Sequence, residues 1–428
     1  MKIAENPSRE QWTELIQRPQ LELGFLESAV RNILNRVKRS GDTALRELTL
    51  QFDKIDINNL QVSETEIDND VETLSPSLRS AIEVAATNIE KFHALQRRDT
   101  VEIETTSGVL CWRKPVAIEK VGIYIPGGTA PLFSTVLMLG TPAKLAGCRE
   151  VILCTPPDRN GNINPAILFA ARCVGVTRIF KVGGAQAIAA LAYGTQSIPS
   201  VHKIFGPGNQ YVTKAKQLVT EEGVAIDMPA GPSEVLVLAD ESSNAKYVAA
   251  DLLSQAEHGE DSQVVLVLLK KGLLDNIQKE LARQLDALPR KAIAEQALAN
   301  SRIVVIENES EAINFVNAYA PEHLIVNTKN PENVASQIIN AGSVFLGNFS
   351  PEAVGDYASG TNHTLPTNGY AKAYAGVSLE SFVKYITFQK LSQDGLRSLG
   401  PVVEQMAEAE QLIGHKMAVR VRLEDLNQ

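Results

Sequence analysis

Short apolar segments recur along this chain at nearly even intervals, with stretches of helical spacing between them. The first three are EVILCTP (150–156), TRIFKVG (177–183) and VHKIFGPG (201–208). Strands that alternate with helices form parallel sheets, because the connection between two parallel strands must cross the sheet and usually holds a helix. This rhythm therefore predicts an α/β fold.

A second series of such segments follows in the other half of the chain. Its members are SEVLVLAD (233–240), QVVLVLLK (263–270), RIVVIEN (302–308), HLIVNT (323–328) and GSVFLG (342–347). At 428 residues the chain is longer than one hydrophobic core usually supports. We therefore predict two Rossmann-like parallel-sheet domains, each incomplete because the dinucleotide fingerprint GxGxxG is absent.

The two ends of the chain have helical spacing instead. In the N-terminal part, Ser75 precedes Pro76 as an N-cap precedes the first position of a helix. Residues 378–428 return to helical spacing and carry Glu410 and His415. A helical tail of this size has little core of its own, so we expect it to dock on other structure, such as a second subunit.

Composition argues against several classes of function. The net charge is −9 with no long Lys/Arg cluster, so nucleic acid and anionic membranes are not expected partners. The first residues have no apolar core or cleavage-like site, and the longest aliphatic run, VVLVLL (264–269), is too short to span a bilayer. The four cysteines show no CxxC spacing: Cys111, Cys148, Cys154 and Cys173. We therefore expect free thiols and a cytoplasmic protein.

Three glycine turns stand at the ends of predicted strands: YIPGGTAPLFS (124–134), VGGAQAIAAL (182–191) and GPGNQYVTKAK (206–216). Free backbone N–H groups at such a turn and the positive end of the following helix can hold an anion. Plain turns use the same residues, so each turn alone leaves both interpretations open. Together the three turns favour a nucleotide-like ligand. Tyr124 could stack on a ring of that ligand, and Gln186 and Asn209 could bond its ribose or amide.

Four side chains suited to metal binding occur in the second half of the chain. Gln255 and His258 are three residues apart at the end of a predicted helix, so they lie along one edge of its last turn. Asp356 and His363 follow in a Gly/Ser/Asn-rich stretch, which is typical of functional surface loops. As a lone pair, Gln255 and His258 favour a structural role over metal binding. The mixed nitrogen and oxygen set suits zinc better than magnesium or calcium.

The segment YAPEHLIV (319–326) places an acid directly before an imidazole, as Glu322 and His323. An ordinary interpretation is a solvated loop that leads into a strand. A catalytic interpretation requires the carboxyl group of Glu322 and the imidazole of His323 to converge, although neighbouring side chains usually point apart. The preceding proline fits a non-helical bend where convergence is feasible.

Taken together, these motifs resemble those of the histidinol dehydrogenase family. The strongest match is IDMPAGPSEVLVLAD running on to DLLSQAEHG (226–259), and the likeness extends over essentially the whole length. Further matching motifs are SGDTALRELTLQFD, VGIYIPGGTAPLFSTVLMLGTPAKLAG, VGGAQAIAALAYGT, FGPGNQYVTKAK, YAPEHL and GDYASGTNHTLPT.

The resemblance implies an activity, cofactors and site residues. The family oxidises L-histidinol to L-histidine through L-histidinal with two NAD⁺, as the last reactions of histidine biosynthesis. It implies one Zn²⁺ per subunit on Gln255, His258, Asp356 and His415. His415 would come from the partner subunit of a homodimer. Substrate contacts would come from those four ligands and from Ser233, His323, His363 and Glu410, and NAD contacts from Tyr124, Gln186 and Asn209.

The resemblance also implies an aldehyde-dehydrogenase-like architecture, which we divide into four parts. An N-terminal helical segment covers 1–22, and a larger α/β domain with the metal and catalytic residues combines 23–123 with 235–377. The second α/β domain, with the glycine turns for NAD, covers 124–234, and the helical tail covers 378–428.

Alcohol oxidation must release a proton, and an imidazole is an efficient base near neutral pH. We assign that task to His323, and we assign to Glu322 the activation of the water that must add to the aldehyde.

Three alternative functions remain compatible with the sequence. The chain could be a zinc hydrolase in which Glu322 activates a metal-bound water, a thiol-dependent aldehyde dehydrogenase that uses Cys111, or a ligand-binding relative without activity.

Overall fold

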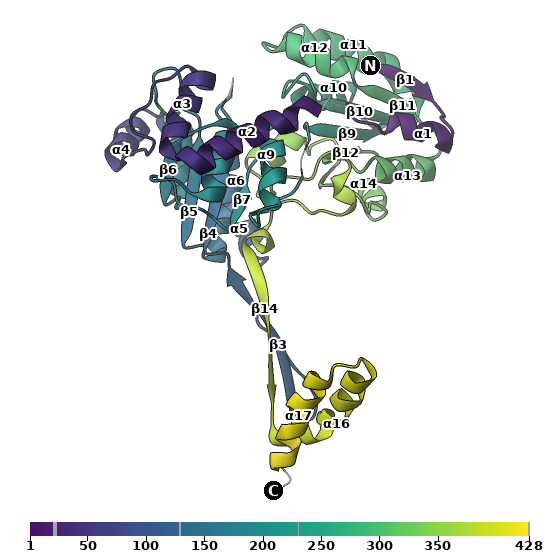
Figure 1. Cartoon of the computed structure of the whole chain (residues 1–428). Helices are drawn as coiled ribbons and strands as arrows, with labels where there is room; N and C mark the ends of the chain where they lie inside the picture. Colours follow the sequence, from purple (N-terminus) through teal and green to yellow (C-terminus); the bar gives the residue numbers. More distant parts are fainter. Residues whose placement is uncertain (20–23, 128–129, 230, 427–428) are drawn as a thin grey trace.

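A computed structural model describes residues 1–19, 24–127, 130–229 and 231–426. It has two lobes, each built on a parallel sheet, and a long arm that extends from the lobes and carries the C-terminus (Figure 1). The predicted α/β class is confirmed. In the part of the chain that the structure describes, every helix is too short or too polar to cross a membrane.

The first lobe contains a five-stranded parallel sheet in the order β6-β5-β4-β7-β8. The predicted segments at 150–156, 177–183 and 201–208 form three of its strands, as expected from their apolar runs. Its strands are β4 (Lys120–Tyr124), β5 (Glu150–Thr155), β6 (Arg178–Lys181), β7 (Lys203–Phe205) and β8 (Ala225–Ile226). Its crossover helices are α6 (Phe133–Ala146), α7 (Pro165–Cys173), α8 (Gly184–Tyr193) and α9 (Gln210–Thr220).

The second lobe contains a six-stranded parallel sheet in the order β1-β11-β10-β9-β12-β13. All five segments of the second predicted series are strands in it. Its strands are β1 (Lys2–Glu5), β9 (Glu234–Ala239), β10 (Gln263–Leu268), β11 (Arg302–Val305), β12 (His323–Asn327) and β13 (Ser343–Leu346). Its helices are α1 (Arg9–Leu15), α10 (Ala245–Ala256), α11 (Leu274–Leu285), α12 (Lys291–Ala299), α13 (Glu309–Tyr319), α14 (Pro331–Ala335) and α15 (Glu352–Tyr357).

The N-terminal region differs from the predicted division. Within the helical segment expected at 1–22, residues 2–5 form β1, which pairs in parallel with β11 and covers that edge of the sheet. Residues 20–22 of that segment lie outside the described residues. The following helices are α2 (Gly24–Ser40), α3 (Asp42–Asp53), α4 (Glu64–Glu72) and α5 (Pro76–Ala94).

These four helices pack on the five-stranded sheet, whereas the prediction grouped residues 23–123 with 235–377. The apolar stripe of α2, which includes Val30 and Ile33, shares a buried core with α8 and α9. Ile82 and Ile89 of α5 share another core with α6 and α7. Complementary apolar faces therefore decide which sheet these helices cover, and periodicity along one helix does not reveal its partner.

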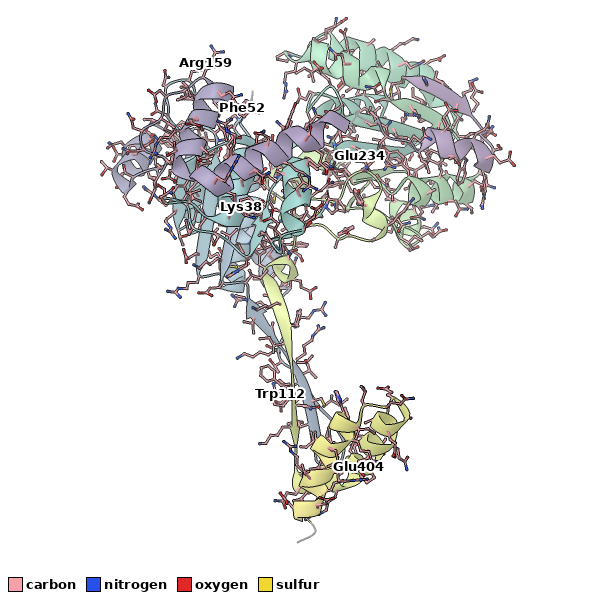
Figure 2. All side chains as sticks on the ribbon, viewed as in Figure 1. Lys38, Phe52, Trp112, Arg159, Glu234 and Glu404 are labelled. Atoms are coloured by element: carbon pink, nitrogen blue, oxygen red, sulfur yellow. The ribbon has the colours of Figure 1, made fainter. Side chains whose placement is uncertain are left out.

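The arm is the second departure from the predicted organisation. Residues 383–391, expected within a helical tail, form strand β14 (Val383–Leu391), which pairs antiparallel with β3 (Val109–Ala117). Strand β2 (Glu102–Thr106) completes a narrow three-stranded sheet, and helices α16 (Gln393–Ala409) and α17 (Ile413–Leu426) lie at its far end. Figure 2 shows side chains along this arm, among them Trp112, which stacks on Phe388 with ring centroids 5.2 Å apart.

Candidate active site

Glu322 and His323 lie where the chain leaves helix α13 and enters strand β12. Ala320 has a left-handed backbone conformation with φ of 54°, which ends the helix, and Pro321 follows it. The turn directs both side chains into the protein, where Glu322 is 5% exposed and His323 is 3% exposed. The pair is therefore not part of a solvated loop.

Carboxylates surround the imidazole of His323 on several sides. Its Nε2 lies 3.2 Å from Oδ1 of Asp356, and its Nδ1 lies 3.6 Å from Oε2 of Glu322. Oε1 of Glu352, at the start of α15, lies 3.8 Å from the same Nδ1. The acid and the imidazole of the YAPEHLIV segment thus converge at their polar ends.

The burial of these groups changes their affinity for protons. Burial alone disfavours the charged imidazolium, but the carboxylates of Glu352, Glu322 and Asp356 outweigh it and raise the pKa of His323 well above its ordinary value. Burial raises the pKa of Glu322 to about 8, against the opposing effect of His323, and it also raises the pKa of Glu352. The site therefore holds two carboxyl groups, Glu322 and Glu352, that can exchange protons near neutral pH.

The end of helix α10 supplies two more of the predicted residues. Gln255 is fully buried, yet neither Oε1 nor Nε2 of its amide finds a hydrogen-bond partner among the described residues. His258 lies just past the helix, and burial lowers its pKa, while the charge of Asp356 opposes this. Since an unpaired buried amide is costly, the arrangement suits a bound ligand or ion.

His363 connects the two lobes at this site. Its Nδ1 lies 2.7 Å from the backbone oxygen of Asp356, which can only accept, so Nδ1 carries the proton. Its Nε2 lies 2.9 Å from Oγ1 of Thr135, on helix α6 of the other lobe. Burial lowers the pKa of His363, which agrees with a neutral ring that accepts from the threonine hydroxyl.

The glycine turns lie at the carboxyl ends of strands in the five-stranded sheet. The backbone N–H of Gly184 donates to the Tyr124 hydroxyl at 3.0 Å, and Gln186 is buried in the first turn of α8. Oδ1 of Asn209 caps helix α9 by accepting from Tyr211 N at 3.0 Å.

The Tyr124 ring is only 3% exposed, because it packs in the core, and it does not offer the open face for stacking that the sequence suggested. Residues 128–129 of the turn at 124–134 lie outside the described residues.

The remaining predicted residues lie on other elements of the chain. Ser233 precedes β9 directly, and β9 is the strand that pairs with β12. Glu410 and His415 belong to the arm, at the end of α16 and within α17, away from the lobes (Figure 1). Cys111 lies on strand β3 of the arm, which provides no support for a thiol mechanism at Glu322 and His323.

One group of ligand atoms in the described residues could hold a metal ion without help from the arm. Side-chain atoms of His323, Glu352 and Asp356 all lie within 4.8 Å of one another. Only Asp356 belongs to the predicted zinc set. Glu352 was missed because an acidic residue in a Ser/Pro/Gly-rich stretch reads as a surface residue, and no spacing signal in the sequence distinguishes it.

The residues present fit a zinc ion in their chemistry. Gln255, His258 and Asp356 offer amide oxygen, imidazole nitrogen and carboxylate oxygen, which are donors that zinc accepts. Oδ1 of Asp356 and both polar atoms of Gln255 are buried and lack hydrogen bonds to the described residues. His415 lies on the arm, so it could be a further donor only from another copy of the chain.

The fold and the site together define an α/β protein with aldehyde-dehydrogenase-like architecture. An aldehyde dehydrogenase from Pseudomonas aeruginosa superposes with a TM-score of 0.50 over 86% of this chain and 89% of that chain. The identity is 14%, so this likeness shows the fold alone. A centre of buried proton-exchanging groups at the junction of two lobes is consistent with an enzyme.

The particular family is shown by comparison with known sequences. The sequence model of histidinol dehydrogenase matches residues 16–423, so the chain belongs to the histidinol dehydrogenase family and is an oxidoreductase. A histidinol dehydrogenase of Bacteroides fragilis is 60% identical over 426 residues, covering 100% of both chains. The chloroplastic histidinol dehydrogenase of Arabidopsis thaliana is 51% identical, covering 98% of this chain and 90% of the plant protein.

A solved structure agrees with this assignment. The crystal structure of histidinol dehydrogenase from Elizabethkingia anophelis matches with a TM-score of 0.98 and 55% identity, covering 100% of this chain and 99% of that one.

Proposed function

We propose that this protein oxidises L-histidinol to L-histidine in two NAD⁺-dependent steps, with zinc in the site, as the last reactions of histidine biosynthesis. The observation that carries the proposal is the buried Glu322–His323 pair beside Asp356, at 3.6 and 3.2 Å. Two oxidations of one carbon require two kinds of proton transfer, and this pair provides both an imidazole and a carboxylate.

Zinc would be held by Gln255, His258 and Asp356 of one subunit and His415 of its partner. When bound, zinc supplies a positive charge that anchors the imidazole and amine of histidinol and fixes the position of its carbinol carbon. The unpaired amide of Gln255 and the unpaired Oδ1 of Asp356, both buried, support this assignment. Ser233, His363 and Glu410 are proposed to contact the substrate with these residues.

His323 is proposed to take the proton that the alcohol releases. The carboxylates of Asp356, Glu322 and Glu352 lie within 3.8 Å of its ring and stabilise the imidazolium that forms. Asp356 would share its negative charge with a bound cation, so we expect the pKa of His323 to fall toward neutrality in the loaded enzyme. The imidazole is then a base matched to the working pH.

Glu322 is proposed to act in the second half of the reaction. The aldehyde must add water before it can be oxidised again, and a carboxylate can remove a proton from that water. Burial raises the pKa of Glu322 to about 8, which makes its carboxylate a stronger base than an exposed one. His323 is near enough to receive the second proton.

NAD⁺ is proposed to bind at the glycine turns, where it accepts the hydride in each oxidation. Tyr124, Gln186 and Asn209 stand at these turns, at the carboxyl ends of the strands, where open parallel sheets bind their ligands. The contact between His363 and Thr135 brings this lobe to the catalytic pair. The two substrates would therefore meet between the lobes.

We further propose a homodimer in which the arm completes the partner's site. The arm carries His415 and Glu410 away from the lobes of its own chain (Figure 1). Its two helices and the turn between them expose large apolar side chains, which is typical of an interaction surface: Val402, Val403, Met406, Leu412, Ile413, Met417 and Val421. A cytoplasmic location is part of this proposal and agrees with the free thiols of the four cysteines.

The test is the stoichiometry of the reaction. Purified protein given L-histidinol and excess NAD⁺ should form two NADH per histidinol, with histidine as the product, because the carbinol carbon loses four electrons. Formation of one NADH with release of the aldehyde would contradict the second step. Absence of NADH together with cleavage of amide substrates would favour the zinc hydrolase instead.

A further inference from the structure

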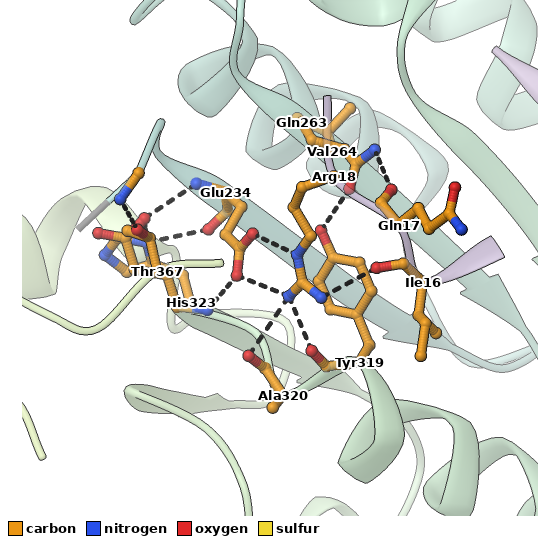
Figure 3. Close-up of polar contacts among 12 residues, drawn as sticks. Ile16, Gln17, Arg18, Glu234, Gln263, Val264, Tyr319, Ala320, His323 and Thr367 are labelled. Carbon is orange, nitrogen blue, oxygen red and sulfur yellow. Dashed lines mark hydrogen bonds and ion pairs between the residues drawn. The ribbon is translucent and has the colours of Figure 1, made fainter. Parts of the chain in front are cut away.

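Glu234, the first residue of strand β9, is bonded to Glu322 in both directions. The backbone N–H of Glu234 donates to Oε2 of Glu322 at 2.9 Å, and the backbone N–H of Glu322 donates to Oε1 of Glu234 at 3.3 Å. The carbonyl of Glu234 also lies 3.3 Å from Nδ1 of His323. One residue of the neighbouring strand therefore contacts both members of the catalytic pair. Figure 3 labels Glu234 and His323.

The carboxylate of Glu234 is in turn held by Arg18, in the segment that follows helix α1. Nε and Nη2 of Arg18 donate to Oε2 and Oε1 of Glu234, each at 2.8 Å, in a bidentate pair. The Glu234 side chain is 1% exposed and that of Arg18 is 11% exposed. Oε1 of Glu234 thus accepts from Arg18 and from the Glu322 backbone together.

Arg18 is itself fixed from several directions. Its guanidinium lies 3.6 Å from the centre of the Tyr319 ring, and Nη2 donates to the backbone oxygen of Tyr319 at 2.7 Å. Nη1 donates to the backbone oxygen of Ile16 at 3.0 Å. The Tyr319 hydroxyl donates to Oε1 of Gln263 at 2.8 Å, so the stacking ring cannot turn freely (Figure 3).

We propose that the Arg18–Glu234 ion pair is a positioning device that holds Glu322 and His323 in the geometry their reaction needs. The proposal rests on the roles proposed above for these two residues. Glu234 is the first residue of a strand that is otherwise apolar, EVLVLA. A buried ion pair at this position has a large desolvation cost, which apolar side chains of similar volume would avoid. Its value lies in orienting Glu322, since two of the bonds around that residue come from Glu234.

The pair also keeps the charge balance around Glu322. Without Arg18, Glu234 would be a buried carboxylate with no cation beside it, next to a second carboxylate. It would turn toward water, which breaks its bond to the backbone N–H of Glu322, or take up a proton, which makes it a weaker acceptor for that N–H. The backbone at Glu322 would then be held less firmly, and its side chain would keep only the bond from the Glu234 backbone N–H, although the fold around it could remain.

The experiment measures the oxidation of histidinol and of histidinal separately in Arg18→Met and Glu234→Gln. We expect kcat for histidinal to fall about ten- to hundredfold, the size typical of residues that orient a functional group. The KM for histidinal and the zinc content should stay near the wild-type values, because neither residue is proposed to touch the substrate or the metal. Arg9→Met is the matched control, since Arg9 forms a bidentate pair with Glu311 on the surface.

A double-mutant cycle separates positioning from simple stability. If Arg18 acts through Glu322, the loss of kcat from Arg18→Met should be much smaller in the Glu322→Gln background than in the wild type, and only the part that acts through His323 should remain. If the two losses multiply, the positioning role is wrong. Failure of the wild-type protein to oxidise histidinol would instead reject the proposed function, so the two failures are distinguishable.

Arg18→Lys covers the case in which Arg18→Met does not fold. Lysine keeps the positive charge but cannot form the bidentate pair. A folded Arg18→Lys protein, with a melting temperature near that of the wild type, should still lose several-fold in kcat for histidinal. Full activity in that variant would overturn the proposal.

Discussion

Each residue of the catalytic pair depends on a local backbone feature and on its neighbours. Ala320, with φ of 54°, ends helix α13 and turns the chain so that Glu322 and His323 both enter the interior. A non-glycine residue in this conformation is held by its surroundings, and such strain is concentrated at functional sites. The chemistry of Glu322 and His323 therefore depends on groups that are far away in the sequence, such as Glu352 and Glu234.

The division of labour within the pair can be tested by two substitutions. His323→Ala should slow both oxidations about hundredfold or more, because both release a proton that a base must accept. Glu322→Gln should mainly slow the oxidation of histidinal, since only that step consumes water. Steady-state rates with each substrate would measure both effects. Equal losses in the two half-reactions of Glu322→Gln would refute the assignment.

Asp251, on helix α10, gives a prediction about stability and pH. Burial raises its pKa from 3.8 to about 7 in the folded protein. The folded state therefore disfavours the charged form, so this residue destabilises the protein increasingly as the pH rises from about 4 to 7, and fully above that.

Asp251→Asn should raise the melting temperature at pH 8 and lose that advantage as the pH falls toward 4. The gain is at most a few kcal/mol, because each unit of pKa displacement corresponds to about 1.4 kcal/mol. Thermal unfolding across this pH range would measure it, with the exposed Asp56→Asn as a control. A constant difference between variant and wild type at all pH values would contradict the account.

At the residue scale, sequence alone identifies groups whose spacing is unusual. Glu322 and His323 are conspicuous as neighbours, and Gln255 and His258 are conspicuous on one helical turn. Arg18 and Glu234 carry no such signal, because a lone charged residue most often lies on the surface. The pairing of β9 with β12 brings Glu234 to the site, and Arg18 reaches the site through its ion pair with Glu234.

Among the elements that the structure describes, the turn after strand β7 is tightly constrained by close packing. Gly206 has φ of 123°, and a Cβ there would lie 2.0 Å from the backbone oxygen of Tyr124. Its N–H donates to Asp227 at 2.8 Å and its carbonyl accepts from Lys216 at 2.8 Å. The turn thus joins strands β4 and β7 to helix α9 at the proposed NAD site.

Gly206→Ala should therefore destabilise the protein by about 3 kcal/mol or more, since the added carbon meets backbone and not a movable side chain. Gly223→Ala is the matched control: its φ is 93°, but a Cβ there meets nothing within 4 Å. The control should cost only about 1 kcal/mol of backbone strain. Denaturant unfolding would compare the two, and equal losses would show that close packing at Gly206 has no effect.

Predictability differed between elements for a physical reason. Strands buried on both faces were found from their apolar runs, as with β5 and β10, and the α/β class was confirmed from them. The arm strands were missed because both of their faces are partly exposed: β14 reads VKYITFQKL and is mostly exposed. A strand without a buried face gives no continuous apolar signal.

On the scale of the whole molecule, the arm is the feature that a single chain does not explain. It carries His415 and Glu410 beyond the lobes, and its apolar helices lack cover from the described part of their own chain. In the proposed homodimer, a second copy related by twofold symmetry covers this surface and receives the same residues in return. The proposed site is therefore incomplete in a monomer.

Mixed dimers test this sharing directly. A His415→Ala chain and a His258→Ala chain should each be inactive alone, while a mixed dimer contains one intact site. Random exchange of subunits should restore about a quarter of the wild-type activity, because half of the dimers are mixed and each has one working site of two. No recovery despite proven subunit exchange would mean that His415 does not act across the interface.

The most direct test of the central claim is to count NADH per histidinol before and after removal of the metal. We predict that protein stripped by a chelator, and verified as folded by circular dichroism, forms almost no NADH, and that added zinc restores two NADH per histidinol. A stripped, folded protein that still forms two NADH per histidinol at the original rate would contradict a catalytic pair that works on a metal-anchored substrate.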